Sequence, residues 1–215
     1  MELNGRVGAQ TARVLVVDDH SAIRSGVEAV LEAEPDLEPV AAAGRAEEAL
    51  ALARQTRPDV AIVDIQLPDR NGLALCLKLK ELPDPVRVVI YSAYADGPLA
   101  LAGVVAGADA VVHKASLATE LCATVRAVAA GRVSLPAVPP ATHAVVAARL
   151  DSQDLPILAM MVAGTSLEEI ARVMDLRPAQ LAARRWAMVK RLCPIAQRGD
   201  GRGARADWPP GPVHA

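Results

Sequence analysis

The sequence predicts a doubly wound α/β domain built on a five-stranded parallel sheet, followed by a small all-α domain. Between residues 12 and 131, short runs rich in Val and Ile alternate five times with helical patterns. These runs lack the every-second-residue alternation of half-exposed strands, as is typical of strands buried on both faces of a parallel sheet. Beyond residue 144 only helical patterns follow. Repeated strand–helix units fold with right-handed crossovers, so the first region should form one wound sheet.

Each strand of this sheet is expected at one of the apolar runs, which are, in chain order, Val14–Val17, Leu37–Ala43, Val60–Val63, Val86–Tyr91 and Ala110–Val112. Between the runs, apolar residues recur at helical spacing. The first helix carries them at i, i+4, i+7 and i+8, namely at Ile23, Val27, Val30 and Leu31. The last helix of the region should end near Ala130 and has one apolar face, formed by Leu117, Leu121, Val125 and Val128.

The chain divides into five expected segments. They are a flexible N-terminus over residues 1–11, the α/β domain over 12–131, a linker over 132–143, the helical domain over 144–196 and a disordered tail over 197–215. The linker is predicted because VSLPAVPPAT contains three prolines and no charge. The tail is rich in Gly and Pro, a composition that does not build a packed core.

The composition excludes some classes of protein. Hydrophobic residues make up 52% of the chain, which argues against wholesale disorder, and no apolar stretch is long enough to cross a bilayer. No targeting signal opens the sequence, so we expect a cytoplasmic protein without a membrane partner. Three widely spaced cysteines, Cys76, Cys122 and Cys193, lie among apolar neighbours and are expected to be reduced.

The net charge differs between the two halves of the chain. Residues 1–135 contain 13 basic and 18 acidic side chains, a net charge of −5, whereas residues 136–215 contain 10 and 7, a net charge of +3. A mildly basic second half suits a nucleic-acid partner.

Polar residues fall where the predicted strands end. Asp18 and Asp19 follow the first strand, Asp64 the third, Ser92 the fourth and Lys114 the fifth. In an open parallel sheet, ligands bind beyond the carboxyl ends of the strands, so these side chains should converge on one pocket. Taken singly, each has a plain structural reading as a helix cap, a turn residue or a solvated lysine.

The expected chemistry of this pocket is phosphoryl transfer. Three close carboxylates repel one another unless a cation lies among them, and Mg²⁺ is a hard ion that prefers oxygen ligands. One carboxylate can then attack phosphorus, and Asp64 is the best candidate because its strand is central. The hydroxyl of Ser92 and the ammonium of Lys114 could bind the oxygens of the transferred group.

Four segments resemble the receiver domain of two-component response regulators: RVLVVDDH, PDVAIVDIQLPDRNG, VVIYSA and GADAVVHK. The resemblance implies that Asp64 accepts a phosphoryl group from a histidine kinase. It implies that Asp18 and Asp19 hold Mg²⁺ with Asp64 and the backbone carbonyl of Gln66, and that Ser92 and Lys114 sense the phosphoryl group. Pro68 and Gly72 match the loop that follows the phosphoacceptor, where Gly permits backbone geometry that other residues resist.

Two positions depart from this family. Val111 stands where the family usually carries a Tyr or Phe that moves inward on activation. Ala115 follows the lysine where a Pro is common. We therefore expect intact chemistry and an altered relay of the signal.

The C-terminal helices resemble the LuxR-type helix-turn-helix, which makes the chain similar to NarL/FixJ-type regulators. Gly164 should end the first helix, Ser166 and Glu169 should form a capping box for the second, and Pro178 should lie in the first turn of the recognition helix. Pro156 would disrupt a helix that began at Ser152, so the first helix is expected to begin late, with Asp154 near its cap.

The candidates for contacts with DNA are Arg184, Arg185, Lys190 and Arg191, all in the third of these helices. Arg185 occupies a position that the family fills with an apolar residue. Ala179, Ala182 and Ala183 offer no hydrogen bonds to base edges. The alternative is therefore a helical bundle with weak or lost DNA binding.

The leading hypothesis is a DNA-binding response regulator that is not an enzyme and that acts as a homodimer, as the resemblance implies. The alternative is a phosphorylation-controlled switch for protein interactions whose helix-turn-helix no longer reads DNA. A hydrolase with an aspartyl-phosphate intermediate is disfavoured, because the acidic pair is adjacent where such enzymes have Asp-x-Asp. No nucleotide-binding glycine motif is present in the sequence.

Overall fold

The computed structural model describes residues 11–95, 97–136 and 138–196. Residues 1–10 of the predicted N-terminal segment and the predicted tail lie outside these ranges. No helix in the described ranges is both long enough and apolar enough to cross a membrane.

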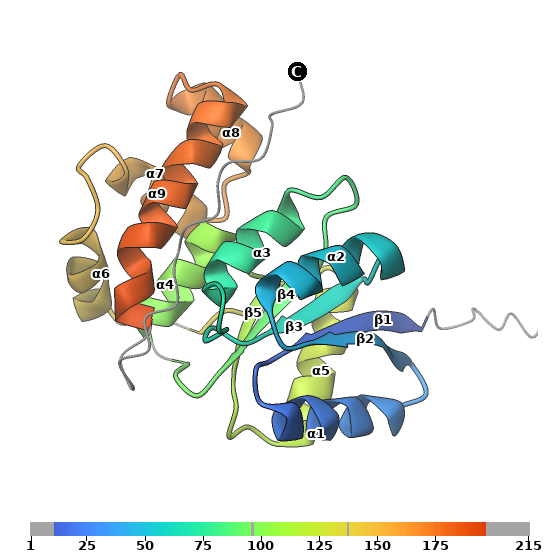
Figure 1. Ribbon diagram of the computed structural model, residues 1–215. Helices are drawn as coiled ribbons and strands as arrows, with labels where there is room; N and C mark the ends of the chain where they lie inside the picture. The colour runs from blue at the N-terminus through green and yellow to red at the C-terminus, as the bar shows by residue number, and fades with distance from the viewer. Residues whose placement is uncertain (1–10, 96, 137, 197–215) are drawn as a thin grey trace, which may run out of the picture.

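Five parallel strands form one sheet in the order β2-β1-β3-β4-β5, which confirms the predicted fold class (Figure 1). The strands are β1 (Ala12–Val17), β2 (Leu37–Ala43), β3 (Val60–Val63), β4 (Arg87–Ser92) and β5 (Ala110–His113). The fourth begins one residue later than predicted, because the N–H of Val86 bonds to the carbonyl of Leu79 outside the sheet.

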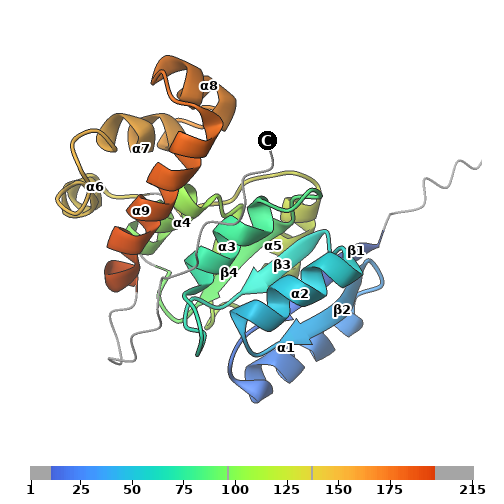
Figure 2. The same cartoon turned by 45° about the horizontal axis from the view of Figure 1, so that its top comes forward.

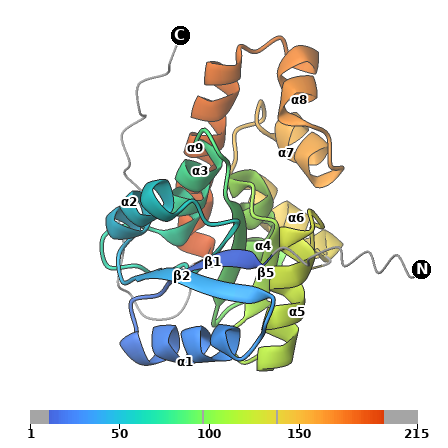
Figure 3. The same cartoon turned by 90° about the vertical axis from the view of Figure 1, so that its right-hand side faces the viewer.

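Helices cover both faces of the sheet (Figure 3). One face packs on α1 (Ser21–Glu32) and α5 (Ala118–Ala129), and the other packs on α2 (Ala46–Thr56), α3 (Gly72–Lys80) and α4 (Gly97–Ala106). Side chains alternate across the strands, so Val14 and Val16 belong to the core of the first face, whereas Leu15 and Val17 belong to the core of the second. Burial on both faces explains the continuous apolar runs in the sequence.

The C-terminal part contains α6 (Pro140–Ala147), α7 (Leu155–Val162), α8 (Leu167–Val173) and α9 (Pro178–Ala196). Asp154 immediately precedes α7, as expected, and Gly164 follows that helix in the left-handed region at φ +80°. Ser166 Oγ accepts a hydrogen bond from the N–H of Glu169, which confirms one half of the predicted capping box.

The segment 132–143, predicted as a linker, is partly structured. Ser134 pairs with the exposed edge of β5, where its N–H bonds to the carbonyl of Asp109 at 2.7 Å. The helical part begins at Pro140, earlier than the predicted Ala144. Proline is well suited to the first turn of a helix, because the N–H that it lacks would have no partner there.

The C-terminal helices pack on the receiver-like sheet domain through α4, which α6, α7 and α9 contact (Figures 1 and 2). The sequence of α4, GPLALAGVVA, contains no polar side chain, and apolar residues of α4 and α9 belong to one continuous core. A helix that is apolar on all sides must be covered on all sides.

Two neighbouring residues of α9 contact the C-terminal ends of α3 and α4. Arg185 donates from Nε to the carbonyl of Val105 in α4 at 3.0 Å. Trp186 donates from Nε1 to Oε1 of Glu81, the residue that caps α3, at 3.0 Å, and its ring lies 5.0 Å from Nζ of Lys78. The docked arrangement therefore combines an apolar core with polar contacts at the helix ends.

Candidate functional site

Backbone hydrogen bonds position the polar residues at one edge of the sheet. The N–H of Asp64 bonds to the carbonyl of Val17 at 2.8 Å, and the N–H of Lys114 bonds to the carbonyl of Ser92 at 2.8 Å. Both bonds continue the ladders just beyond the strand ends. Side chains that are scattered over the sequence therefore meet at the carboxyl edge, as predicted.

The lysine lies between two buried carboxylates. Lys114 Nζ is 2.6 Å from Oδ2 of Asp18 and 3.0 Å from Oδ2 of Asp64. Asp18 and Asp64 are 2% and 4% exposed, so their charges are poorly solvated and depend on neighbouring cations.

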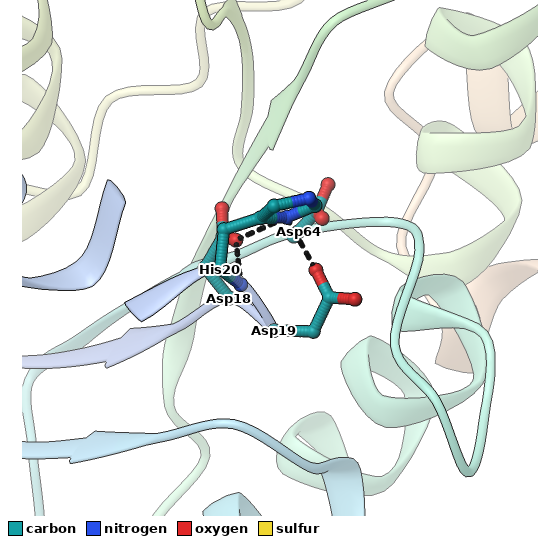
Figure 4. A group of neighbouring side chains, drawn as sticks. All are labelled: Asp18, Asp19, His20 and Asp64. Atoms are coloured by element: carbon teal, nitrogen blue, oxygen red, sulfur yellow. Dashed lines mark hydrogen bonds and ion pairs between the residues drawn. The ribbon is translucent and has the colours of Figure 1, made fainter. Parts of the chain in front are cut away.

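The acidic cluster has the donors for a metal ion. Ligand atoms from Asp18, Asp19, His20 and Asp64 all lie within 4.8 Å of one another (Figure 4). Asp18 Oδ2 is buried and lacks a well-aligned hydrogen bond, although the Lys114 ammonium is close. Carboxylate oxygens with spare lone pairs fit a hard divalent cation.

Burial raises the pKa of the Asp64 carboxyl to about 6. The Lys114 ammonium opposes this shift, whereas the Asp18 carboxylate adds to it. Burial lowers the pKa of Lys114, but its hydrogen bonds and ion pairs with Asp18 and Asp64 outweigh burial, so its pKa is raised overall. A bound cation would favour the ionised form of Asp64, because opposite charge stabilises a carboxylate.

The cluster opens into a cleft of about 220 Å³, to which Ser92, Gln66, Tyr94 and Lys114 contribute. Ser92 is 4% exposed, and its Oγ accepts a hydrogen bond from the N–H of Tyr94 at 3.2 Å. The cleft brings the predicted hydroxyl and ammonium to the same side of Asp64.

Gly72 is needed for close packing beside Asp64. A Cβ at this position would lie 2.0 Å from the main-chain oxygen of Asp64. The φ of Gly72 is not in the left-handed region, so the backbone geometry that requires a glycine here is the close approach to Asp64. The start of α3 lies directly against the backbone at the end of β3.

Sequence reasoning missed two residues of this site. His20 Nδ1 lies 2.6 Å from Oδ1 of Asp19, and its position directly after the acidic pair was a usable signal. Tyr91 donates from its hydroxyl to the carbonyl of Lys114 at 3.2 Å, which ties the end of β4 to the lysine loop.

The three arginine residues predicted to contact DNA bind other residues of the protein. Arg184 and Arg191 both bind the buried carboxylate of Asp154, at 2.9 and 3.1 Å. Arg185 is 8% exposed and contacts α4. Lys190 is exposed. The structure therefore places Arg185 against the sheet domain rather than on an outer surface.

The wound sheet and its edge of Asp, Ser and Lys side chains define a receiver, a class of domain that is switched by phosphorylation. The family model for the response regulator receiver domain matches residues 14–126. The chain belongs to this family, and it is a regulator of the NarL/FixJ type.

Relatives match over one or both parts of the chain. The DNA-binding transcriptional activator DevR/DosR of Mycobacterium tuberculosis is 39% identical over 120 residues, which cover 56% of this chain and 55% of that protein. The transcriptional regulatory protein UhpA of Salmonella typhimurium is 31% identical over 182 residues, which cover 83% of this chain and 90% of UhpA.

The same relationship appears among solved structures. The crystal structure of a LuxR-family two-component response regulator from Aurantimonas is 33% identical with a TM-score of 0.56, and the match covers 59% of this chain and 90% of that one.

Proposed function

We propose that this protein is a cytoplasmic response regulator that accepts a phosphoryl group on Asp64 from a histidine kinase and regulates transcription by binding double-stranded DNA. The observation that carries the proposal is the placement of Lys114 between the buried carboxylates of Asp18 and Asp64. The likeness to UhpA over 90% of its length and the name of DevR/DosR support a transcriptional role, and they favour it over a switch that has lost DNA binding.

In the proposed transfer, a carboxylate oxygen of Asp64 forms a bond to phosphorus. The P–N bond to the phosphohistidine of the kinase breaks, and its electron pair stays on the imidazole nitrogen. Lys114 and Ser92 hold the oxygens of the arriving group. We assign Asp18, Asp19, Asp64 and the carbonyl of Gln66 as ligands for Mg²⁺, which when bound neutralises charge on the carboxylates and the phosphoryl oxygens.

The site assignment is tested by incubating the full chain with acetyl phosphate and Mg²⁺ and measuring the intact mass. We expect one added phosphoryl group on the wild type and none on Asp64→Asn. Asp84→Asn changes an exposed acidic residue outside the site and should be labelled normally. Equal labelling of the Asp64→Asn protein would refute the assignment.

Transcriptional function is tested by selecting duplexes from genomic fragments with the phosphorylated protein. The proposed active form is a homodimer, which sedimentation of the phosphorylated protein should detect. A protein that selects no sequence would support the alternative switch for protein interactions.

A further inference from the structure

We propose that the C-terminal helices bind DNA while they remain docked on the receiver, through an exposed tip. The tip comprises Arg172, the turn from α8 to α9, and the first residues of α9 as far as Ala183. This inference rests on the proposed DNA-binding function. It adds the docked arrangement in which the helix-turn-helix would meet the DNA.

Separating the C-terminal helices from the receiver costs free energy. Seven residues of α4 are buried, and α4 shares its core with Met188, Val189 and Leu192 of α9. Separation would expose both apolar surfaces to water, which is unfavourable in proportion to their area.

Both ends of α4 are also held by the C-terminal helices. Arg185 caps the C-terminal end through the carbonyl of Val105. At the other end, a Cβ added to Gly97 would lie 2.8 Å from Oγ1 of Thr142 in α6. The close fit at both ends holds α4 against the C-terminal helices.

Three arginine residues in the middle of α9 make contacts within the protein. Arg184 and Arg191 hold Asp154, and Arg185 holds α4. Giving up these contacts for DNA would leave the buried carboxylate of Asp154 and the carbonyl of Val105 without their donors, which is costly. These three arginines are therefore less available to DNA than the exposed residues of the helix-turn-helix.

The tip points away from the receiver. In Figures 1 and 3 the turn between α8 and α9 lies at the end of the molecule farthest from the sheet. Arg172, Arg177, Gln180 and Ala183 are all exposed there. In helix-turn-helix proteins the N-terminal residues of the recognition helix are the ones that contact base edges. The receiver thus covers the later part of α9 and leaves the N-terminal residues of this helix exposed to solvent.

Gln180 and Arg177 form a prearranged pair at this end. Gln180 Oε1 accepts hydrogen bonds from the backbone N–H of Arg177 at 2.9 Å and from its Nε at 3.3 Å. The amide nitrogen of Gln180 then remains as a donor for a base edge, and the guanidinium of Arg177 remains for a phosphate.

Acidic residues on the same tip limit the expected affinity. Glu168 and Asp175 are exposed, and Arg172 lies 3.3 Å from Glu169. Few phosphate contacts are available, so we expect a shallow dependence of affinity on salt.

The first experiment measures the affinity of full-length variants for a duplex selected from genomic fragments. We expect Gln180→Glu to lower affinity on the order of tenfold, because it removes the amide donors and adds a negative charge. Glutamate at this position keeps the oxygen that caps α9, so the fold is preserved. Arg177→Ala should lower affinity for selected and scrambled duplexes alike, whereas Arg149→Ala, which removes an exposed arginine away from the tip, should not.

The second experiment locks the docked arrangement. Glu81→Cys and Trp186→Cys face each other across the interface, where the native side chains are 3.0 Å apart, and a short bis-maleimide can join them. The three native cysteines are buried, so wild type treated with the reagent is the labelling control. We expect the cross-linked protein to bind the duplex as tightly as the same double variant without the linker.

The outcomes separate this inference from the proposed function. Loss of binding only after cross-linking would show that the helices must undock, and it would overturn the inference while leaving the function intact. Normal binding by the Arg177→Ala and Gln180→Glu proteins would overturn the assigned tip. If the wild-type protein bound no duplex, the proposed DNA-binding function itself would be refuted.

Discussion

The Nε of Arg185 in α9 donates a hydrogen bond to the carbonyl oxygen of Val105 in the last turn of α4, across 3.0 Å. The last carbonyls of a helix have no partner within it, and a cation at that end is also favoured by the helix dipole. Burial lowers the pKa of Arg185, which remains charged because arginine is so basic. A charged residue in this usually apolar position is thus explained by its role as a helix cap in another part of the fold.

Arg185→Ala should therefore destabilise the whole protein. The change leaves the carbonyl of Val105 without its donor and opens a cavity, at a cost of about 2–3 kcal/mol in the free energy of unfolding. Urea denaturation measures this cost, and Arg149→Ala should change stability by less than about 0.5 kcal/mol. Equal stabilities of the two variants would show that the contact contributes nothing.

Gly72→Ala should be among the most damaging small substitutions in the chain. Its Cβ would meet the main-chain oxygen of Asp64, and we expect a loss of about 3 kcal/mol or more. Gly26 is a matched control, because it lies in α1 with no atom within 4 Å of an added Cβ. Gly26→Ala should gain about 0.5–1 kcal/mol by improving helix propensity. Thermal denaturation of the two variants should move in opposite directions.

The stability of the metal-free protein should depend on pH through Asp64. Folding raises the pKa of this carboxyl from 3.8 to about 6, so ionisation costs stability as the pH rises from the lower value through the higher one. Asp64→Asn removes the charge and should raise the free energy of unfolding by about 1–3 kcal/mol near pH 8, and by little near pH 4.

Urea denaturation with a chelator at both pH values tests this dependence. The exposed Asp84→Asn substitution should show no such difference between the two. If the gain from Asp64→Asn were the same at both pH values, folding would not raise the pKa of Asp64.

Mg²⁺ should stabilise the native protein, because a ligand that binds only the folded state adds about 2.7 kcal/mol at a concentration of 100 times its Kd. The melting temperature of wild type should rise with Mg²⁺ in the low millimolar range. Asp19→Ala removes one proposed ligand and should reduce the rise, whereas Asp84→Ala should retain it. A wild-type melting temperature indifferent to Mg²⁺ would contradict the proposed site.

Val111 should weaken the coupling between phosphorylation and DNA binding. It is 8% exposed and faces Gly103 of α4, where it offers less apolar area than an aromatic ring. At about 25 cal/mol per Å², the missing burial removes on the order of 1–2 kcal/mol of the difference between the two states. We therefore expect appreciable DNA binding without phosphorylation.

DNA affinity with and without phosphorylation measures this coupling, in wild type and in Val111→Tyr. The tyrosine should increase the difference between the two states. A large difference in wild type that the substitution leaves unchanged would reject the role of Val111.

The receiver site was predictable because parallel topology determines it. Asp18, Asp64 and Lys114 each follow a parallel strand, and parallel strands end at the same edge of the sheet. Their proximity can therefore be predicted without knowing the geometry of the side chains. The same reasoning could not assign partners to Arg184 and Arg191, because Asp154 lies about thirty residues away in sequence, at the start of a different helix.

The sequence of α4 already indicated that another layer of the protein, which includes Arg185, must cover this helix. The sequence GPLALAGVVA has no polar residue, so this helix could not face water on either side, and a second layer over it was foreseeable. The layer that covers it could only be found in three dimensions, because apolar faces occur on several of the C-terminal helices.

The apolar surface of α4 also constrains how this protein can diverge or be recombined. Leu101 and Val105 belong to one core with residues of the sheet and of α9, so a substitution at either must suit that shared packing. A chimera that joins this receiver to the output helices of another regulator would leave α4 without its matching surface. Exchange of either part alone is therefore expected to leave apolar surface of α4 exposed to water.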